Sequence, residues 1–339
     1  FRKPAYFEFP TVSPPKCQIR IMRTLFTVLA IIGSVSKFCH SAESLPPHIE
    51  TLDEIYEEVR GYAKRFSVLA RLTEIGTTYE KRPIYCLIIH DRSNPNPDLT
   101  VLVEFGVHAR EWASPASGLF LIRQLLVNTN YRKLIQEIKW IIIPVMNPDG
   151  YHYSTDIFKG SDKERRFWRK NRRPLNPSKC FGVDLNRNYP VGFERNNSRL
   201  AAACDEIFSG PGPLSEPETQ AMDELLSSLG YVDAYVAVHA CSQSILHPYG
   251  YKKKTPSRKF MNILRKAANL MKKSMSKVAG TKYKVQSAAD LYLAGGASDD
   301  YAFENFNIPI VYTLELGYDS EDDEKCFHPG PKEMIQLQR

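Results

Sequence analysis

The chain has 339 residues, 43% of them hydrophobic, and its 45 Lys and Arg exceed its 38 Asp and Glu to give a formal net charge of +7. A chain of this length and composition can bury a large core, which argues against a disordered protein. It contains no internal repeat and no low-complexity tract, which argues against a repeat architecture as well.

The first 45 residues differ in character from the rest. Arg20 and Arg23 precede an apolar run at 24–33, and small residues follow at 41–42. This order is that of a secretory signal peptide, and the run is too short to span a bilayer. We therefore expect residues 1–45 to be an upstream extension and a secretory signal peptide.

Residues 46–339 are expected to form one folded domain. Strand-like runs alternate with helix-like stretches, a pattern typical of βαβ units and hence of an α/β fold. The predicted strands are Pro83–Ile89, Thr100–Phe105, Trp140–Val145, Ala234–Val238 and Ile310–Leu314.

A His and a Glu follow the second of these strands in a pattern that suits a metal. The apolar run 101–107 leads into His108-Ala-Arg-Glu111-Trp, and Ser114-Pro115 then begins a helix-like stretch. Both side chains would lie at the carboxyl end of a strand, which is where ligands bind in open α/β sheets. Zinc accepts imidazole and carboxylate ligands, but it needs a third protein ligand here.

The sequence alone leaves the third ligand open. An apolar run at 235–238 is followed by His239, in a context that matches that of His108. His90 also ends a strand-like run. The pattern favours His239 without excluding His90.

A series of strings from about Thr51 to about Ile335 resembles, in the same order, the metallocarboxypeptidases of the A/B type. The resemblance implies a single α/β domain with a mixed, mostly parallel eight-stranded sheet flanked by helices, and a zinc-dependent exopeptidase activity. The strings are His108-Ala-Arg-Glu-Trp, Asn147-Pro-Asp-Gly-Tyr, Phe167-Trp-Arg-Lys, Gly182-Val-Asp-Leu-Asn-Arg-Asn-Tyr, His239-Ala-Cys-Ser-Gln, Pro248-Tyr-Gly-Tyr and Thr313-Leu-Glu-Leu.

The resemblance assigns the residues that carry the chemistry. It implies that His108, Glu111 and His239 ligate one Zn²⁺, which would act as Lewis acid and activate a water molecule. Glu315 corresponds to the general base and later acid. Arg169 corresponds to the cation that stabilises the oxyanion, a role for which the sequence by itself could not distinguish it from its neighbouring arginines.

The resemblance also implies recognition of a free C-terminal carboxylate on a peptide or protein. Asn186 and Arg187 correspond to the clamp that binds this carboxylate, because guanidinium and amide groups donate hydrogen bonds to it. Tyr292 corresponds to a mobile tyrosine that closes over it, and Arg110 to a contact with the substrate backbone in an outer subsite.

Specificity depends on one position of the alignment. Asp300-Tyr301 matches the Asp-aromatic pair of the family, which places Asp299 at the base of the pocket and favours release of C-terminal Lys or Arg, as in B-type enzymes. The Gly295-Gly296 pair stands one residue closer to Tyr292 than is usual. An alignment shifted to restore that spacing would place Ser298 at the base and favour hydrophobic residues, as in A-type enzymes.

Secretion would permit disulfides. The resemblance implies a Cys180–Cys204 bridge. Cys86 lies inside an apolar strand and is expected to be a buried free thiol. Cys241 and Cys326 occupy positions where relatives carry aromatic residues, and the sequence leaves open whether they pair.

We therefore expect a secreted, extracellular and monomeric enzyme, with no nucleic-acid partner and no stable membrane association. An inactive peptide-binding homologue is the alternative, but Glu315, Arg169 and the three metal ligands are all present. Residues 51–56 resemble the start of the mature enzyme, so we expect no inhibitory prosegment, and we expect the final helix of the family to be missing after Arg339. The positive charge near residues 252–277 is interpreted as a solvated surface.

Overall fold

The computed structural model describes residues 49–94, 96–156, 163–193, 203–279, 281–317 and 326–327. The predicted signal peptide and the predicted loss of the last helix lie outside these ranges. No helix in the described ranges is long and apolar enough to cross a membrane.

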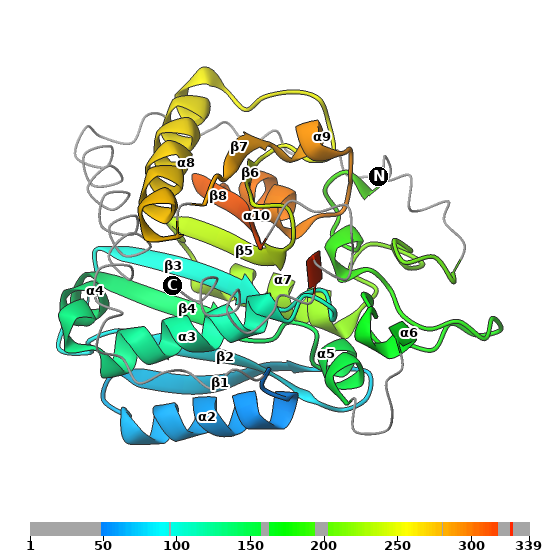
Figure 1. Cartoon of the computed structure of the whole chain (residues 1–339), viewed down its shortest axis with the longest axis horizontal. Coiled ribbons are helices and arrows are strands. Elements are labelled where there is room, and N and C mark those ends of the chain that lie inside the picture. The colour runs from blue at the N-terminus through cyan, green and yellow to red at the C-terminus, as the bar shows by residue number, and fades with distance from the viewer. Residues whose placement is uncertain are drawn as a thin grey trace, which may run out of the picture.

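The core of the fold is one eight-stranded sheet with the strand order β1-β2-β4-β3-β5-β8-β6-β7 (Figure 1). Four of its seven neighbouring pairs are parallel, so the predicted mixed sheet of an α/β domain is confirmed. The strands are β1 (Ala70–Thr77), β2 (Pro83–Ile89), β3 (Leu99–Phe105), β4 (Ile138–Ile143), β5 (Ala234–Ala240), β6 (Ser244–His247), β7 (Lys284–Ser287) and β8 (Ile310–Leu316).

The central parallel strands β4, β3, β5 and β8 are apolar on both faces because helices cover both faces of the sheet. Leu102 of β3 pairs with Ile141 of β4 on one side and with Tyr235 of β5 on the other, and all three are fully buried. All five strands predicted from the sequence are present, with shifts of up to two residues at their ends.

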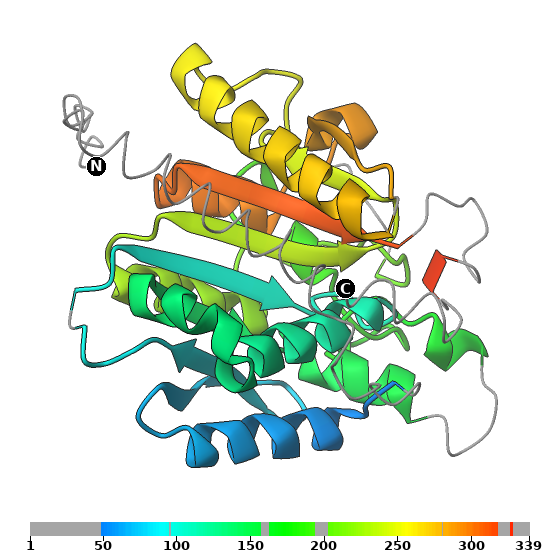
Figure 2. The ribbon, with the colours of Figure 1, turned by 60° about the vertical axis from the view of Figure 1, so that its left-hand side comes forward.

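The helices form two layers. Tyr312 of β8 donates a hydrogen bond to the Leu264 carbonyl of α8, whereas the next residue, Thr313, bonds Asp299 of α10. Because successive side chains in a strand point to opposite faces, α8 and α10 cover opposite faces of the sheet, as Figure 2 shows. The helices are α2 (Leu52–Arg65), α3 (Ala113–Val127), η2 (Thr129–Tyr131), α4 (Arg132–Glu137), α5 (Pro148–Thr155), α6 (Lys163–Arg166), η4 (Leu185–Arg187), α7 (Pro217–Leu229), α8 (Arg258–Ala279), α9 (Ala288–Leu291) and α10 (Ser298–Asn305).

A tight turn at the carboxyl end of β3 connects the sheet to α3. Gly106 starts this turn at φ +64°, and an added Cβ would meet Pro115 Cγ at 2.8 Å. Ser114, near the start of α3, also stabilises this turn. Its hydroxyl accepts a hydrogen bond from the Gly106 amide and donates one to the Val238 carbonyl of β5. The segment between Gly106 and Ser114, which contains His108 and Glu111, is thus fixed at both ends to β5 through Ser114.

Substitution of Gly106 by Ala should destabilise the protein. The side chain would meet both an unfavourable backbone conformation and a close contact, so we expect the free energy of unfolding to fall by about 1–3 kcal/mol. Gly61→Ala is the matched control: nothing lies within 4 Å of its Cβ position on α2, and it should stabilise by roughly 0.5–1 kcal/mol. Urea denaturation measures both, and equal stabilities of the two variants would contradict the account.

Candidate active site

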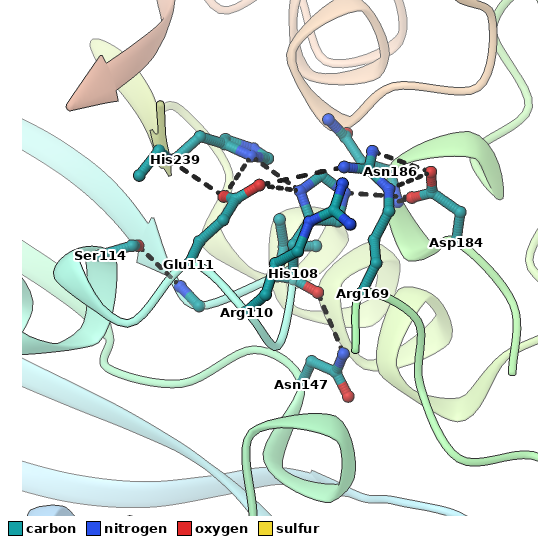
Figure 3. A network of polar contacts seen from close by, with 12 residues as sticks. His108, Arg110, Glu111, Ser114, Asn147, Arg169, Asp184, Asn186 and His239 are labelled. Atoms are coloured by element: carbon teal, nitrogen blue, oxygen red, sulfur yellow. Dashed lines mark hydrogen bonds and ion pairs between the residues drawn. The ribbon is translucent and has the colours of Figure 1, made fainter. Parts of the chain in front are cut away.

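Two histidines and a glutamate converge at the carboxyl ends of β3 and β5 (Figure 3). His108 and Glu111 lie in the turn after β3, and His239 lies in β5. His108 Nδ1 is 2.7 Å from Glu111 Oε1, and His239 Nδ1 is 3.1 Å from Glu111 Oε2. The structure therefore brings the three predicted metal ligands together and does not use His90.

The donor set fits a buried divalent cation. One ligand atom from each residue lies within 4.8 Å of the other two, and all three residues are buried. The Nδ1 atoms of His108 and His239 face each other at 3.2 Å. Two imidazole nitrogens and a carboxylate directed at one point are the ligand types and the number that a catalytic zinc site takes from a protein.

Electrostatics give this cluster a carboxylate that stays ionised. Burial by itself would raise the pKa of Glu111, but the adjacent His108 and His239 outweigh it and hold that pKa well below its usual range. Burial disfavours charge on His239, yet the Glu111 carboxylate raises its pKa to about 9. A cation in the cluster would replace the protons that these groups otherwise share.

Asp184 orients the first metal-binding histidine, and the sequence analysis did not single it out. Its Oδ1 lies 3.1 Å from His108 Nε2, the ring nitrogen on the far side from Glu111. A carboxylate in this place fixes the tautomer and the orientation of a metal-binding imidazole. Asp184 lies two residues before Asn186 in a string that matched the family, which was the available signal.

Arg169 connects this carboxylate to the cluster. Its Nε and one terminal nitrogen bond Asp184 Oδ2 at 3.0 and 2.9 Å, and its other terminal nitrogen lies 4.0 Å from Glu111 Oε1. Burial opposes the charge on Arg169, but Asp184 raises its pKa, so the guanidinium stays protonated. Asp184 thus holds two of the three guanidinium nitrogens and leaves the third directed at the cluster.

Glu315 lies beside the cluster on β8, directly opposite His239 of β5 in the strand register. The carboxyl is partly buried, and this burial is the main cause that raises its pKa to about 7, with a further contribution from Glu111. A carboxyl group with such a pKa can accept and return a proton near neutral pH.

Asn186 and Arg187, which are predicted to bind the substrate's terminal carboxylate, lie in η4. Arg187 is buried, and its guanidinium lies 3.4 Å from the hydroxyl of Tyr292, whose side chain is 53% exposed. The amide of Ser298 donates to Asn186 Oδ1 at 2.9 Å, which orients the Asn186 side chain so that its Nδ2 group remains as a donor. An exposed tyrosine thus lies over a buried cation, and the closure of Tyr292 over a bound carboxylate stays a prediction.

Asp299 and Ser298 begin α10 and make different contacts. The Ser298 hydroxyl donates to the buried Glu104 carboxylate of β3 at 2.9 Å. Asp299 is 3% exposed and accepts from Thr313 Oγ1 at 2.9 Å and from the Asp300 amide at 2.8 Å. Thr313 precedes Glu315 by two residues on β8, so both face the same side of the sheet as Asp299.

Arg110 pairs with an acidic side chain at the protein surface. Its guanidinium bonds the exposed Glu206 carboxylate at 3.0 Å and lies 4.6 Å from the ring of Phe327. The predicted contact of Arg110 with the substrate backbone stays a prediction. Such a contact would compete with the ion pair to Glu206.

Two disulfides stabilise the loops around the site. Cys180–Cys204 has a Cα separation of 5.1 Å, and it is the bridge that the resemblance implies. Cys241 and Cys326, which the sequence left open, also pair, with Cα atoms 5.6 Å apart. Cys86 is the free and buried cysteine among the described residues, and burial raises the pKa of its thiol to about 12.

Known proteins are similar to this chain in sequence. The family described as zinc carboxypeptidase matches residues 55–339. Carboxypeptidase O of Homo sapiens is 36% identical over 78% of this chain and 69% of its own length, and carboxypeptidase B of Rattus norvegicus is 36% identical over 71% of this chain and 57% of its own length. The chain thus belongs to the zinc carboxypeptidase family, and its fold and site are those of a peptide hydrolase.

Solved structures agree with this membership. Carboxypeptidase A from Helicoverpa armigera has a TM-score of 0.77 at 26% identity, covering 94% of this chain and 77% of that chain. Bovine thrombin-activatable fibrinolysis inhibitor, in complex with a tick carboxypeptidase inhibitor, has a TM-score of 0.75 at 29% identity, covering 86% of this chain and 93% of that chain. Relatives named A, B and O all appear, so the comparisons leave side-chain specificity unresolved.

Removal of the charge on Asp184 should weaken metal binding. Asp184→Asn keeps the shape of the side chain but loses the carboxylate on His108 Nε2, so we expect the zinc dissociation constant to rise about 10–100-fold. Competition with a chromophoric chelator measures it. Glu206→Gln, which removes an exposed carboxylate from Arg110, should leave zinc affinity unchanged. Equal affinities of the two variants would show that Asp184 does not act on the site.

Proposed function

We propose that this chain is an extracellular zinc carboxypeptidase that removes single Lys or Arg residues from the C-termini of peptides and proteins. The observation that carries this specificity is the Asp299 carboxylate, which is buried and has no cationic partner in the part of the chain that the structure describes. A buried carboxylate is costly unless a cation or sufficient hydrogen bonds compensate it. A Lys or Arg side chain of the substrate would supply that cation.

A single hydrogen bond connects the residue before Asp299 to the predicted carboxylate clamp. Ser298, whose amide bonds Asn186 of the clamp, directly precedes Asp299. A residue held by its terminal carboxylate at Asn186 and Arg187 would therefore have its side chain beside Asp299. This arrangement suits a free C-terminal residue, because an internal residue has no carboxylate for Arg187 to bind.

The catalytic steps are assigned to residues around the cluster. Zinc held by His108, Glu111 and His239 would supply Lewis acidity toward the scissile carbonyl and the attacking water. Glu315 accepts a proton from that water and delivers it to the leaving nitrogen as the C–N bond breaks. The Arg169 nitrogen that Asp184 does not bond stabilises the negative charge that develops on the carbonyl oxygen.

The disulfides support an extracellular location. Both bridges join loops near the site, and such bridges persist in oxidising compartments. The predicted signal peptide agrees with this location but lies outside the described residues.

Loss of the Glu315 carboxylate should abolish most of the turnover. Glu315→Gln keeps the size of the side chain and removes the proton acceptor, so kcat should fall at least ~10²-fold while the zinc content stays the same. Glu304→Gln on α10 is the control and should retain normal kcat. Steady-state kinetics with a short blocked peptide test this, and near-normal turnover of Glu315→Gln would place the base elsewhere.

Substitution at Asp299 should change substrate preference. A charged contact of this kind costs about 2–5 kcal/mol when one partner is removed, so Asp299→Ala should lower kcat/KM for C-terminal Arg by roughly 30-fold or more. Release of C-terminal Leu should hold steady or increase, because the pocket loses a carboxylate that apolar side chains cannot satisfy.

Ser298→Ala is the matched comparison for Asp299→Ala. It should lower the rates for Arg and Leu substrates to a similar extent, since Ser298 bonds Glu104 and not the substrate. A wild-type protein that prefers Leu, or a parallel loss for Arg and Leu in Asp299→Ala, would reject the assignment to basic residues while leaving the zinc chemistry untouched.

A further inference from the structure

The positive charge of the chain is concentrated in one segment. Residues 252–289 contain ten Lys and two Arg and no Asp or Glu. The remaining residues hold 33 Lys and Arg against 38 Asp and Glu, so the rest of the chain is net negative. The net charge of +7 is therefore a property of α8 and the residues that flank it, and not of the surface as a whole.

The fold gathers these cations on one face. In α8, Met261, Leu264 and Met271 face the sheet and are buried. Arg258, Arg265 and Lys272 are exposed and spaced by seven residues, so they form one stripe along the helix. A second stripe beside it consists of Lys259, Lys266, Lys273 and Lys277. These stripes run over about 29 Å of helix, from the rise of 1.5 Å per residue. Figure 2 shows α8 lying along one face of the sheet.

The stripe cations differ from most other arginines of the described residues in having no acidic partner there. In the described ranges, the arginines that form ion pairs are Arg82, Arg110, Arg123, Arg132, Arg165, Arg169, Arg172 and Arg173. None is formed there by a cation of either stripe. Of the segment, Lys252 has a carboxylate partner, Glu304. The face thus presents uncompensated charge, which favours an anionic ligand.

A polar pocket lies against this face. It has a volume of about 470 Å³ and is lined by Lys253, Lys254, Arg265 and Asn269, with Asp290 as its one acidic residue. Arg265 belongs to both the pocket and the first stripe. The pocket and the stripe are therefore continuous, and one extended anion could contact both.

We propose that this face, the stripes together with the pocket, binds a sulfated polysaccharide chain. The spread of cations over about 29 Å suits a linear polyanion better than a single small anion. Among the residues whose side chains the structure describes, no large exposed hydrophobic side chain lies within residues 252–289. The face therefore lacks the apolar residues by which an amphipathic helix enters a membrane surface and the aromatic rings on which single-stranded nucleic acids stack.

The disulfides favour an extracellular ligand. They indicate an oxidising compartment, and in the extracellular space sulfated polysaccharides are abundant linear polyanions. The proposal assigns a binding role to charge that the sequence by itself indicates only as a solvated surface. The proposal is independent of peptidase specificity, because none of its residues belongs to the clamp, the pocket around Asp299 or the metal cluster.

The test is the affinity of the full chain for a heparin decasaccharide, measured by fluorescence titration at several NaCl concentrations. The variant Arg258→Gln, Arg265→Gln, Lys272→Gln removes the first stripe, and Gln preserves the helix propensity of Lys and Arg. We expect this variant to bind heparin at least about tenfold more weakly than the wild type near 0.15 M NaCl. We also expect the slope of log affinity against log NaCl concentration to become shallower by about two to three, because fewer counterions are released. Its peptidase activity on a short peptide should stay normal, which shows that it is folded.

The matched control removes the same number of positive charges, two Arg and one Lys, from a second pocket. Arg71, Arg92 and Lys139 line a pocket on the β1–β2–β4 side of the sheet. Their combined change to Gln should leave heparin binding as in the wild type. Equal losses in both variants, absence of wild-type binding near 0.15 M NaCl, or tighter binding to a single-stranded oligonucleotide or to phosphatidylserine vesicles than to heparin would each overturn the proposal.

Discussion

The structure depends on the convergence of two imidazoles and a carboxylate in a space that is almost closed to solvent. Such groups repel or share protons unless a cation lies among them, because an isolated buried charge is costly. The parallel strands β3 and β5 bring His108 and His239 to one edge of the sheet, and the Gly106 turn places Glu111 between them. The rest of the active site is arranged around this point.

Three buried carboxylates near that point differ mainly in their partners. Asp184 has a permanent cation, Arg169, and acts as a support. Glu111 faces two imidazoles and has the environment of a metal ligand. Among the described residues, Asp299 accepts hydrogen bonds from two neutral donors, the Thr313 hydroxyl and the Asp300 amide, and has no cationic partner. The three carboxylates thus meet the same electrostatic requirement in three different ways, and the roles proposed for them rest on this difference.

The sequence predicted the parts of this account that depend on local patterns. Runs of apolar residues gave the central strands, whereas β1, β6 and β7 are short or half-exposed and left little signal. His108 and Glu111 are three residues apart and could be recognised together. His239 comes close to His108 only because β3 and β5, which are distant in the sequence, pair in the sheet. The local pattern therefore could not distinguish His239 from His90 as the third metal ligand. Asp184 sits in a loop with no periodicity, and its role appears only when the fold brings it to His108.

X-ray absorption spectroscopy at the zinc edge tests the central claim most directly, because it reports the ligands of the metal in the intact protein. The account predicts about one zinc per chain with two imidazole nitrogens at about 2.0–2.1 Å and oxygen ligands at about 2.0–2.2 Å. A zinc bound through sulfur, a single imidazole in the coordination shell, or a purified protein that does not retain zinc would contradict it.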